Sequence, residues 1–474
     1  MNLLLQIFTA PLAAAAGLGR WFLGLSLAGR IAVAVALFQA FLVTLAVAVI
    51  LLAGGIPIFQ AWWTPGKFTA LVVLMFVVPA LVFLAAQLWL HHDVARWPDI
   101  DNAWQQARVE LDRQAIDIRT TPLFLVVGLD GRDDEQTLMD AVPGSLVVKW
   151  APSGSAPLHA YASNDAVFVC LSGIGATCAL LNGGGRPAGP DGQAEAAGDA
   201  ATSAADAWRG EIAPKQRLDD ATEHEAAERL RTVCEWLETA RQPVAAINGV
   251  VVALPFGHGE TAAAAALGAA VSTDLQIIFG TLGMRAPVTI AWRGLEGLPG
   301  FRELLATIPV QQRQAALGTA WPAGLPVTHS QAHDLAVATY GAVIDKVSDH
   351  LLQPQSLQQP VVNRSLIELA CRLRLTAGTT LATLLQRVVA LSDPTTGPPP
   401  VAGSYFIAAS SGSAPDCFAR GMLDRVAAVQ GELEWNKRRL LHDRTCRILG
   451  RLLGGLDAAL IIGAIGVIWW RLAG

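Results

Sequence analysis

Two long stretches without a charged residue limit most strongly what this chain can fold into. They run from Ile31 to Ile56 and from Phe68 to Leu90. Each is long enough to cross a hydrocarbon core of about 30 Å as a helix that rises about 1.5 Å per residue. Only the short link from Pro57 to Lys67 separates them. The sequence therefore predicts a transmembrane helical hairpin over residues 31–90.

A third apolar stretch, Leu452 to Trp470, predicts a C-terminal transmembrane helix within residues 452–474. Trp469 and Trp470 would lie at the far interface, where indole rings concentrate. Asp457 lies near the start of this stretch, which allows two interpretations. Its side chain is either an intramembrane charge that pairs with a partner helix, or a charge that reaches the interface. Residues 1–30 are apolar but lack a basic leader and a clear cleavage site, and we interpret them as an N-terminal interfacial segment.

The basic residues predict the orientation in the membrane. They lie before the first stretch and after the second, and they crowd the approach to the third between Lys437 and Arg451. The opposite ends carry only Lys67 and Arg471. Because basic residues remain on the cytosolic side, we expect a multi-pass protein of the bacterial inner membrane, with its main segment in the cytosol.

Charge and cysteine spacing exclude several kinds of function. A net charge of −5 gives no reason to expect a nucleic-acid partner. The six cysteines include no Cys-x-x-Cys pair, so they predict neither a disulfide framework nor a zinc site. His329 and His333 are four residues apart, but Ser330 stands where a His-Glu-x-x-His motif has glutamate. We expect a solvated helix face there and no bound metal.

The segment after the hairpin alternates between strand and helix patterns, which is typical of an α/β fold with a mainly parallel sheet and helices on both faces. Strands are predicted at Pro122–Val127, Ser145–Trp150, Ala166–Leu171, Ala245–Leu254, Pro287–Trp292 and Gly403–Ala409. Helices are predicted from Leu218 to about Leu237, over Glu260–Leu282, near Phe301, over Gln331–Leu352 and over Val361–Leu391.

These patterns predict three parts between the membrane segments. Residues 91–121 form a linking helical arm, residues 122–410 a cytosolic domain, and residues 411–451 a helical basic connector. Within the domain, residues 331–400 are mostly helical. Residues 182–214 are rich in Gly, Ala, Pro and acidic residues, and we expect a disordered insertion there, because they hold too little apolar surface to offset the entropy of ordering.

Four local signatures in this order resemble the N-terminal half of the IcmF/TssM family, the inner-membrane component of type VI secretion. They are Pro122-Leu-Phe-Leu-Val-Val-Gly128, Gln242-Pro-Val-Ala-Ala-Ile-Asn-Gly-Val-Val-Val252, Ala286-Pro-Val-Thr-Ile with Gly297-Leu-Pro-Gly-Phe301, and Val401-Ala-Gly-Ser-Tyr-Phe-Ile407. The resemblance implies a cytosolic domain like that of P-loop GTPases.

The resemblance also identifies the positions at which this chain departs from the nucleotide-binding residues of a P-loop. Counted from Gly128, the P-loop positions for the second glycine, the lysine and the hydroxyl hold Asp133, Asp134 and Glu135. Three carboxylates would face the phosphates, and one like-charge pair at about 4 Å costs on the order of 4 kcal/mol at an effective dielectric near 20.

The second nucleotide motif also departs from the family pattern. Its magnesium-supporting Asp is replaced by Cys170, ahead of Ser172-Gly173, and the base-reading lysine near Gly294 is missing. We therefore expect a pseudo-GTPase scaffold without a cofactor and without catalysis.

The resemblance implies partners as well: a TssL-like inner-membrane subunit and baseplate subunits such as TssK and TssG, in a hetero-oligomeric complex within the lipid bilayer. Two other functions stay open, an active NTPase that energises secretion and a membrane-anchored pseudo-GTPase regulator outside secretion. Family members continue after the third span into a large periplasmic portion, whereas only Arg471 to Gly474 follow Trp470. The expectation is that this chain does not bridge to the outer membrane by itself.

Overall fold

The computed structural model describes residues 27–62, 65–91, 96–129, 131–182, 218–256, 261–322, 327–390, 397–408, 417–437, 439–441, 443–445 and 448. The chain divides into two compact units. One comprises Met1–Arg96 with Leu441–Gly474, and the other comprises Trp97–Leu440. The predicted third span with Asp457, and all but the first residue of the expected insertion at 182–214, lie outside the described residues.

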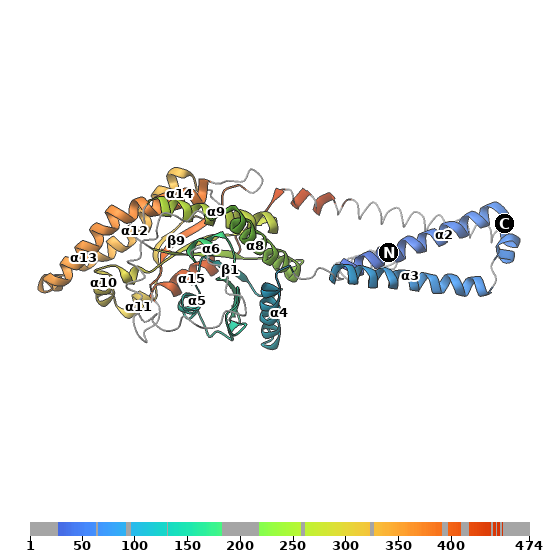
Figure 1. Cartoon of the computed structure of the whole chain (residues 1–474), viewed down its shortest axis with the longest axis horizontal. Helices are drawn as coiled ribbons and strands as arrows, with labels where there is room; N and C mark the ends of the chain where they lie inside the picture. Colours follow the sequence, from blue (N-terminus) through green and yellow to red (C-terminus); the bar gives the residue numbers. More distant parts are fainter. Residues whose placement is uncertain are drawn as a thin grey trace, which may run out of the picture. The chain divides into compact units, whose positions relative to one another are not determined.

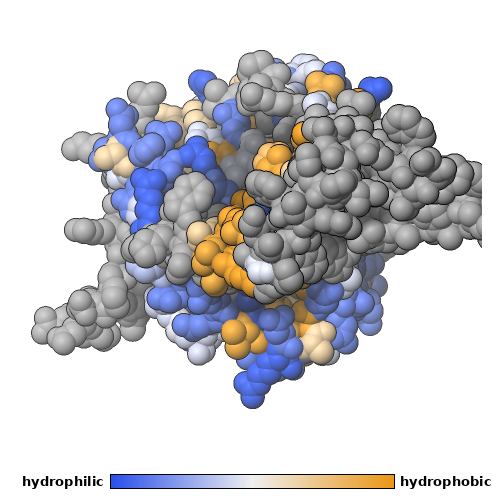
Figure 2. Space-filling model, turned by 90° about the vertical axis from the view of Figure 1, so that its right-hand side faces the viewer, coloured by the Kyte–Doolittle hydropathy of each residue, from blue (hydrophilic) through white to orange (hydrophobic). Residues whose placement is uncertain are grey.

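The first unit contains two long helices, α2 (Leu27–Trp62) and α3 (Pro65–His91), which pack against each other as a helical hairpin (Figure 1). Their described side chains are mostly apolar, and many are exposed: Phe38 and Phe76 are 60% and 74% exposed. In Figure 2, hydrophobic residues, coloured orange, are exposed on the face that the picture draws. A helix that is apolar on all sides requires either a protein core or lipid around it.

Length and hydropathy alone identify a different helix as able to cross a membrane. Among the residues that the structure describes, it is α9 (Thr261–Leu282), while α2 and α3 contribute the shorter apolar stretches Ile31–Ala46 and Val73–Ala86. α9 packs against two helices of the second unit, α8 (Asp220–Arg241) and α14 (Gly378–Ala390). The two-span membrane hairpin therefore remains a prediction.

The second unit is built on a mostly parallel, eight-stranded sheet in the order β2-β3-β4-β1-β5-β7-β9-β8. The five strands from β4 to β9 run parallel, while β2, β3 and β8 are antiparallel to their neighbours. The strands are β1 (Leu123–Val127), β2 (Val148–Ala151), β3 (His159–Ala162), β4 (Val167–Leu171), β5 (Gly249–Pro255), β7 (Val288–Arg293), β8 (Leu317–Ala320) and β9 (Val401–Phe406). The predicted mixed α/β fold with a mainly parallel sheet is confirmed.

Helices cover both faces of this sheet (Figure 1). Besides α8, α9 and α14, the described helices are α4 (Pro98–Arg113), α5 (Arg132–Met139), α6 (Ala176–Leu181), α10 (Phe301–Thr307), α11 (Val310–Arg313), α12 (His329–Leu351), α13 (Pro360–Arg372) and α15 (Ala419–Ala428). Short 3-10 turns lie at Leu295–Gly297 and Pro354–Gln358, and a π-helical turn at Leu373–Ala377 joins α13 to α14.

Strand β1 shows how the two cores form. Side chains alternate across a strand, so Leu123, Leu125 and Val127 join the larger hydrophobic cluster with α4, α8, α9, α12 and α14. Phe124 and Val126 point to the opposite face, into a smaller cluster with α5 and α15. All five side chains are buried, as expected for a central parallel strand covered on both sides.

Several elements differ from the sequence-based expectations. Strands β3 and β8 were not predicted, because four-residue runs such as His-Ala-Tyr-Ala have weak β-propensity and gain their order from pairing with a neighbour. The expected helical connector over 411–451 is not helical throughout. It includes α15 and the strand β10 (Glu434–Trp435), which pairs antiparallel with β6 (Met284–Arg285) and keeps the chain in the second unit as far as Leu440.

Candidate functional site

The candidate site lies at the carboxyl end of β1. This strand sits between β4 and β5, so the chain proceeds first to one side of β1 and later to the other. In open α/β sheets, ligands bind outside the carboxyl ends of the strands at such a reversal of strand order. Gly128 follows β1 here, and α5 begins at Arg132. The structure thus brings the predicted first motif to the edge where a nucleotide would bind.

The surroundings of position 128 require a glycine there. Its φ of +82° lies in the left-handed region, and a Cβ built on it would lie 2.5 Å from the carbonyl oxygen of Ala253 in β5. Gly131, the N-cap of α5, also has a positive φ of +91°, but a Cβ there would meet nothing within 4 Å. The β1–α5 turn is therefore pressed against β5 at Gly128 and open at Gly131.

The three carboxylates at the start of α5 lie in three different surroundings. The resemblance implies that all three face the phosphates. Successive helix residues are rotated by about 100° about the helix axis, so the three side chains cannot all face one phosphate site. Asp133 is exposed. Asp134 forms an ion pair with Arg293 at the end of β7, and Nη2 of the same arginine donates to the carbonyl oxygen of Gly128 over 3.4 Å. Glu135 is fully buried.

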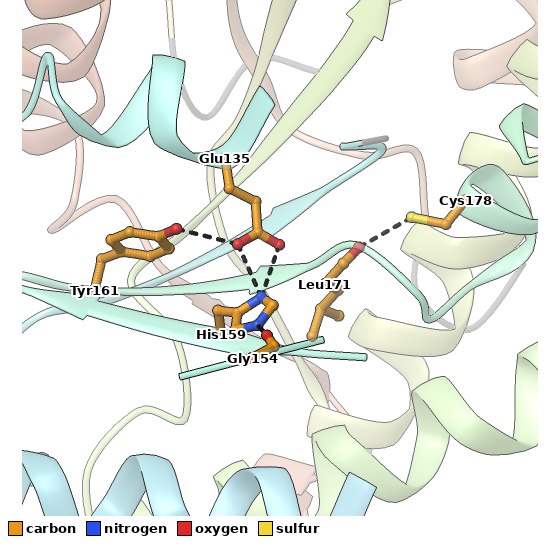
Figure 3. A network of polar contacts seen from close by, with 6 residues as sticks. All are labelled: Glu135, Gly154, His159, Tyr161, Leu171 and Cys178. Atoms are coloured by element: carbon orange, nitrogen blue, oxygen red, sulfur yellow. Dashed lines mark hydrogen bonds and ion pairs between the residues drawn. The ribbon is translucent and has the colours of Figure 1, made fainter. Parts of the chain in front are cut away.

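Glu135 is the centre of a buried polar network (Figure 3). Its Oε1 and Oε2 lie 3.1 Å and 2.9 Å from Nδ1 of His159, and the hydroxyl of Tyr161 donates to Oε2 over 3.2 Å. Nε2 of His159 lies 3.0 Å from the carbonyl oxygen of Gly154. Because a carbonyl can only accept, Nε2 carries a proton, and a further proton is shared between Nδ1 and the Glu135 carboxylate. The buried charge is thus paired within the protein.

Strand β3 supplies both partners of Glu135. His159 and Tyr161 are two residues apart, so their side chains leave the same face of the strand. Burial, followed by the charge of Glu135, raises the pKa of Tyr161 well above its usual value, so its hydroxyl remains a donor. The His159 ring also packs against Trp150, on which the guanidinium of Arg132 lies 3.6 Å from the ring centroid. Sequence reasoning missed these residues because it did not predict β3.

Cys170 lies in the interior of the sheet. It is paired in register with Val126 of β1 and His159 of β3, and it packs in the same hydrophobic cluster as α5. Burial, followed by the charge of Glu135, raises the pKa of its thiol, which therefore stays protonated. Gly173 follows the strand, where its N–H donates to the carbonyl oxygen of Pro157 over 3.1 Å. A neutral thiol in the sheet is a poor ligand for magnesium, which prefers oxygen.

A carboxylate that sequence reasoning missed lies at the carboxyl end of β4. Asp274 of α9 is buried, and it accepts hydrogen bonds from the backbone N–H groups of Ala176 and Thr177 over 2.7 Å and 2.8 Å. Burial raises its pKa to about 6, against the opposing effect of these hydrogen bonds. Gly175 allows the approach, since a Cβ there would lie 2.9 Å from Asp274 Oδ2. One signal was available: Asp274 is the single charged residue of the 22-residue helix α9.

The structure places the histidine pair at the start of a helix. His329 and His333 lie exposed on the first turns of α12. Within the described ranges of the chain, no group of three or more His, Cys, Asp or Glu side chains could hold a metal ion.

Comparison with known proteins supports the family resemblance for part of the chain. Residues 223–440 match the model of the IcmF-related N-terminal domain. The match runs from α8 to the end of the second unit, and it begins after the turn that contains Asp133, Asp134 and Glu135. Comparison with curated proteins and with solved structures gave no match. The likeness to the IcmF-related N-terminal domain is thus found over residues 223–440.

Proposed function

We propose that this chain is a non-catalytic scaffold subunit of a type VI secretion membrane complex, with a pseudo-GTPase cytosolic domain. The observation that carries the proposal is that side chains of the protein itself occupy the carboxyl end of β1. Asp134 is paired with Arg293, and Glu135 is buried with His159 and Tyr161. A P-loop instead presents backbone N–H groups, a lysine and a hydroxyl to phosphate and magnesium.

Electrostatics opposes a nucleotide at this turn. Each carboxylate within about 4 Å of a phosphate costs on the order of 4 kcal/mol at an effective dielectric near 20. Arg293 reaches the turn, and its charge is directed to Asp134 and Gly128. The other motif position contributes a neutral thiol, Cys170. Of the three motif carboxylates, Asp134 and Glu135 are paired within the protein and Asp133 is exposed, so a nucleotide would meet a carboxylate where a P-loop offers a lysine.

The full-length protein is expected to bind neither ATP nor GTP with a dissociation constant below about 100 μM, which corresponds to roughly 5.5 kcal/mol. Isothermal titration calorimetry with magnesium present measures this directly. Tighter binding would favour the rival function, an active NTPase that energises secretion.

A repaired variant serves as the control for this titration. Asp133→Gly, Asp134→Lys and Glu135→Thr together restore the first motif, yet they are not expected to restore hydrolysis, because Cys170 still provides no oxygen ligand for magnesium. Hydrolysis by the triple variant would contradict the assignment of a second independent loss at Cys170.

The proposed partners follow from the likeness to IcmF/TssM proteins. They are a TssL-like inner-membrane subunit and baseplate subunits such as TssK and TssG, which would dock on the cytosolic unit. Co-purification from native membranes tests this assignment. Recovery of the chain without any secretion subunit would favour the other rival, a membrane-anchored pseudo-GTPase regulator outside secretion.

We further propose that α2 and α3 cross the inner membrane and that residues 91–451 are cytosolic. The support comes from the charge-free stretches and the basic residues that flank them. Reporter fusions at Thr64 and after Gly474 are expected to behave as exported, and a fusion at Gly192 as internal. An exported fusion at Gly192 would overturn this orientation.

A further inference from the structure

The second unit is connected to the rest of the chain at both of its ends, and both ends are held on helix α8. Arg229, in the middle of α8, forms an ion pair with Asp99 at the start of α4. Glu238, in the last turn of α8, forms an ion pair with Arg439, just before the unit ends at Leu440. The first and the last segment of this unit therefore meet the same helix.

The first segment, α4, is fixed by its hydrophobic side chains. Ile100, Trp104 and Leu111 are buried in the larger hydrophobic cluster. Arg229 is buried as well, and its guanidinium lies 5.1 Å from the ring centroid of Trp97. Burial of large apolar side chains is the main stabilising contribution to a fold. Helix α4 therefore cannot leave the unit unless part of the core unfolds.

The last segment, residues 434–440, is held by polar contacts, and we call it the exit strap. None of its residues that the structure describes is buried. Its strand β10 is only two residues long and pairs with β6. Glu434 forms an ion pair with Arg285, and the N–H of Asn436 donates to the carbonyl oxygen of Gly283 over 3.0 Å. The exit strap thus contributes little apolar surface to the core.

Arg439 makes the contacts that join the exit strap to the two helices. Its Nη1 donates to the carbonyl oxygen of Leu282, the last residue of α9, over 2.8 Å, and its Nη2 pairs with Glu238. Gly283 leaves room for this side chain, because a Cβ there would lie 2.8 Å from Cδ of Arg439. A cation at the carboxyl end of a helix is favourable. One side chain thus connects the strap to the carboxyl ends of both α8 and α9.

We propose that the exit strap is a releasable connection, which detaches from α8 and α9 while the rest of the unit stays folded, and that Arg439 holds it in place. Partly exposed ion pairs and a two-residue ladder stabilise only weakly. Segments with few buried contacts open at a lower free energy than the core. The unit therefore has one fixed connection, at α4, and one releasable connection. This proposal stands whether or not the chain acts in secretion.

Hydrogen exchange of the full-length protein in detergent, measured by mass spectrometry, tests this proposal. In the parent protein, amides of the exit strap are expected to exchange at least about tenfold faster than those of β5, relative to their intrinsic rates. Arg439→Gln is expected to speed exchange of the strap about tenfold further, because it removes both the bond to Leu282 and the ion pair. Glu238→Gln removes the ion pair alone and is expected to speed exchange about threefold.

Lys437→Gln is the matched control for Arg439→Gln. It also removes one positive charge from the strap, but its side chain is exposed, so exchange is expected to stay within about twofold of the parent. Exchange of β5 is expected to stay at the parent level in all three variants. The proposal would be overturned by a strap that exchanges equally in Arg439→Gln and Lys437→Gln, by an equal rise in β5, or by a parent strap as slow as β5.

Arg229→Gln tests the fixed connection. The part of α4 from Trp104 to Leu111 shares its hydrophobic cluster with β1, so it is expected to open only together with that strand. Exchange in this part of α4 is therefore expected to stay within about threefold of exchange in β1, in the parent and in the variant. If α4 exchanged about tenfold faster than β1 in Arg229→Gln, both connections would be releasable, and the proposed difference between them would be wrong.

Discussion

Glu135→Ala is expected to lower the free energy of unfolding by about 3 to 4 kcal/mol, as the removal of one member of a buried charged pair commonly does. The carboxylate is fully buried and accepts from both His159 and Tyr161. Without it, the His159 ring and the Tyr161 hydroxyl remain buried and lose their partner. Urea-induced unfolding of the full-length protein, solubilised in detergent and monitored by tryptophan fluorescence, measures the change.

Neighbouring positions supply controls for this result. Asp133→Ala removes an exposed carboxylate from the same helical turn and is expected to change the free energy of unfolding by less than about 0.5 kcal/mol. Tyr161→Phe removes one hydrogen bond and is expected to cost about 1 kcal/mol. If Glu135→Ala were as stable as Asp133→Ala, the carboxylate would not be a structural replacement for the motif hydroxyl, and the proposed pseudo-GTPase would lose its main support.

Gly128→Ala is expected to lower the free energy of unfolding by about 3 kcal/mol, from two sources. A left-handed backbone conformation costs an L-residue about 1 to 2 kcal/mol, and the displacement of a packed neighbour costs about as much again. The neighbour here is the carbonyl oxygen of Ala253, which lies 2.5 Å from a Cβ built on Gly128 and belongs to a strand fixed on both sides. The same unfolding experiment gives the value.

Gly131→Ala is a comparison variant without crowding. Gly131 has open space where its Cβ would be, but its φ of +91° and ψ of −169° lie in a region that other residues hardly adopt. It is expected to lose a conformational part alone, about 1 to 3 kcal/mol. A loss at Gly128 of only about 1 to 2 kcal/mol, its own conformational part, would mean that β5 can yield, and that the β1–α5 turn is looser than its packing implies.

The packing at Gly128 bears on the proposed pseudo-GTPase. Gly128 makes a tight turn against β5, while Asp134 and Glu135 pair with other side chains of the domain. The main-chain path is maintained by packing against β5, which does not depend on a nucleotide. The turn therefore keeps its conformation without a ligand, because the buried core stabilises it.

The sequence by itself determined those features that repeat along the chain. The central strands β1, β5 and β7 were predicted because continuous apolar runs have few alternatives to a buried parallel sheet. Long helices such as α9 and α12 were predicted from apolar residues at helical spacing. The expectation that Asp133, Asp134 and Glu135 do not hold phosphate also followed directly from their charge.

Only the tertiary structure decided what those carboxylates do. His159 comes 24 residues after Glu135, and Arg293 comes from a strand more than a hundred residues further along the chain. Strand β3, which carries His159 and Tyr161, has too little local signal to be predicted and is ordered by pairing with β2 and β4. Asp274 likewise reaches the start of α6 from a distant helix. Local pattern determines which elements form, whereas the partner of a buried charge depends on which elements the sheet order brings together, and that order is set by the packing of the whole domain.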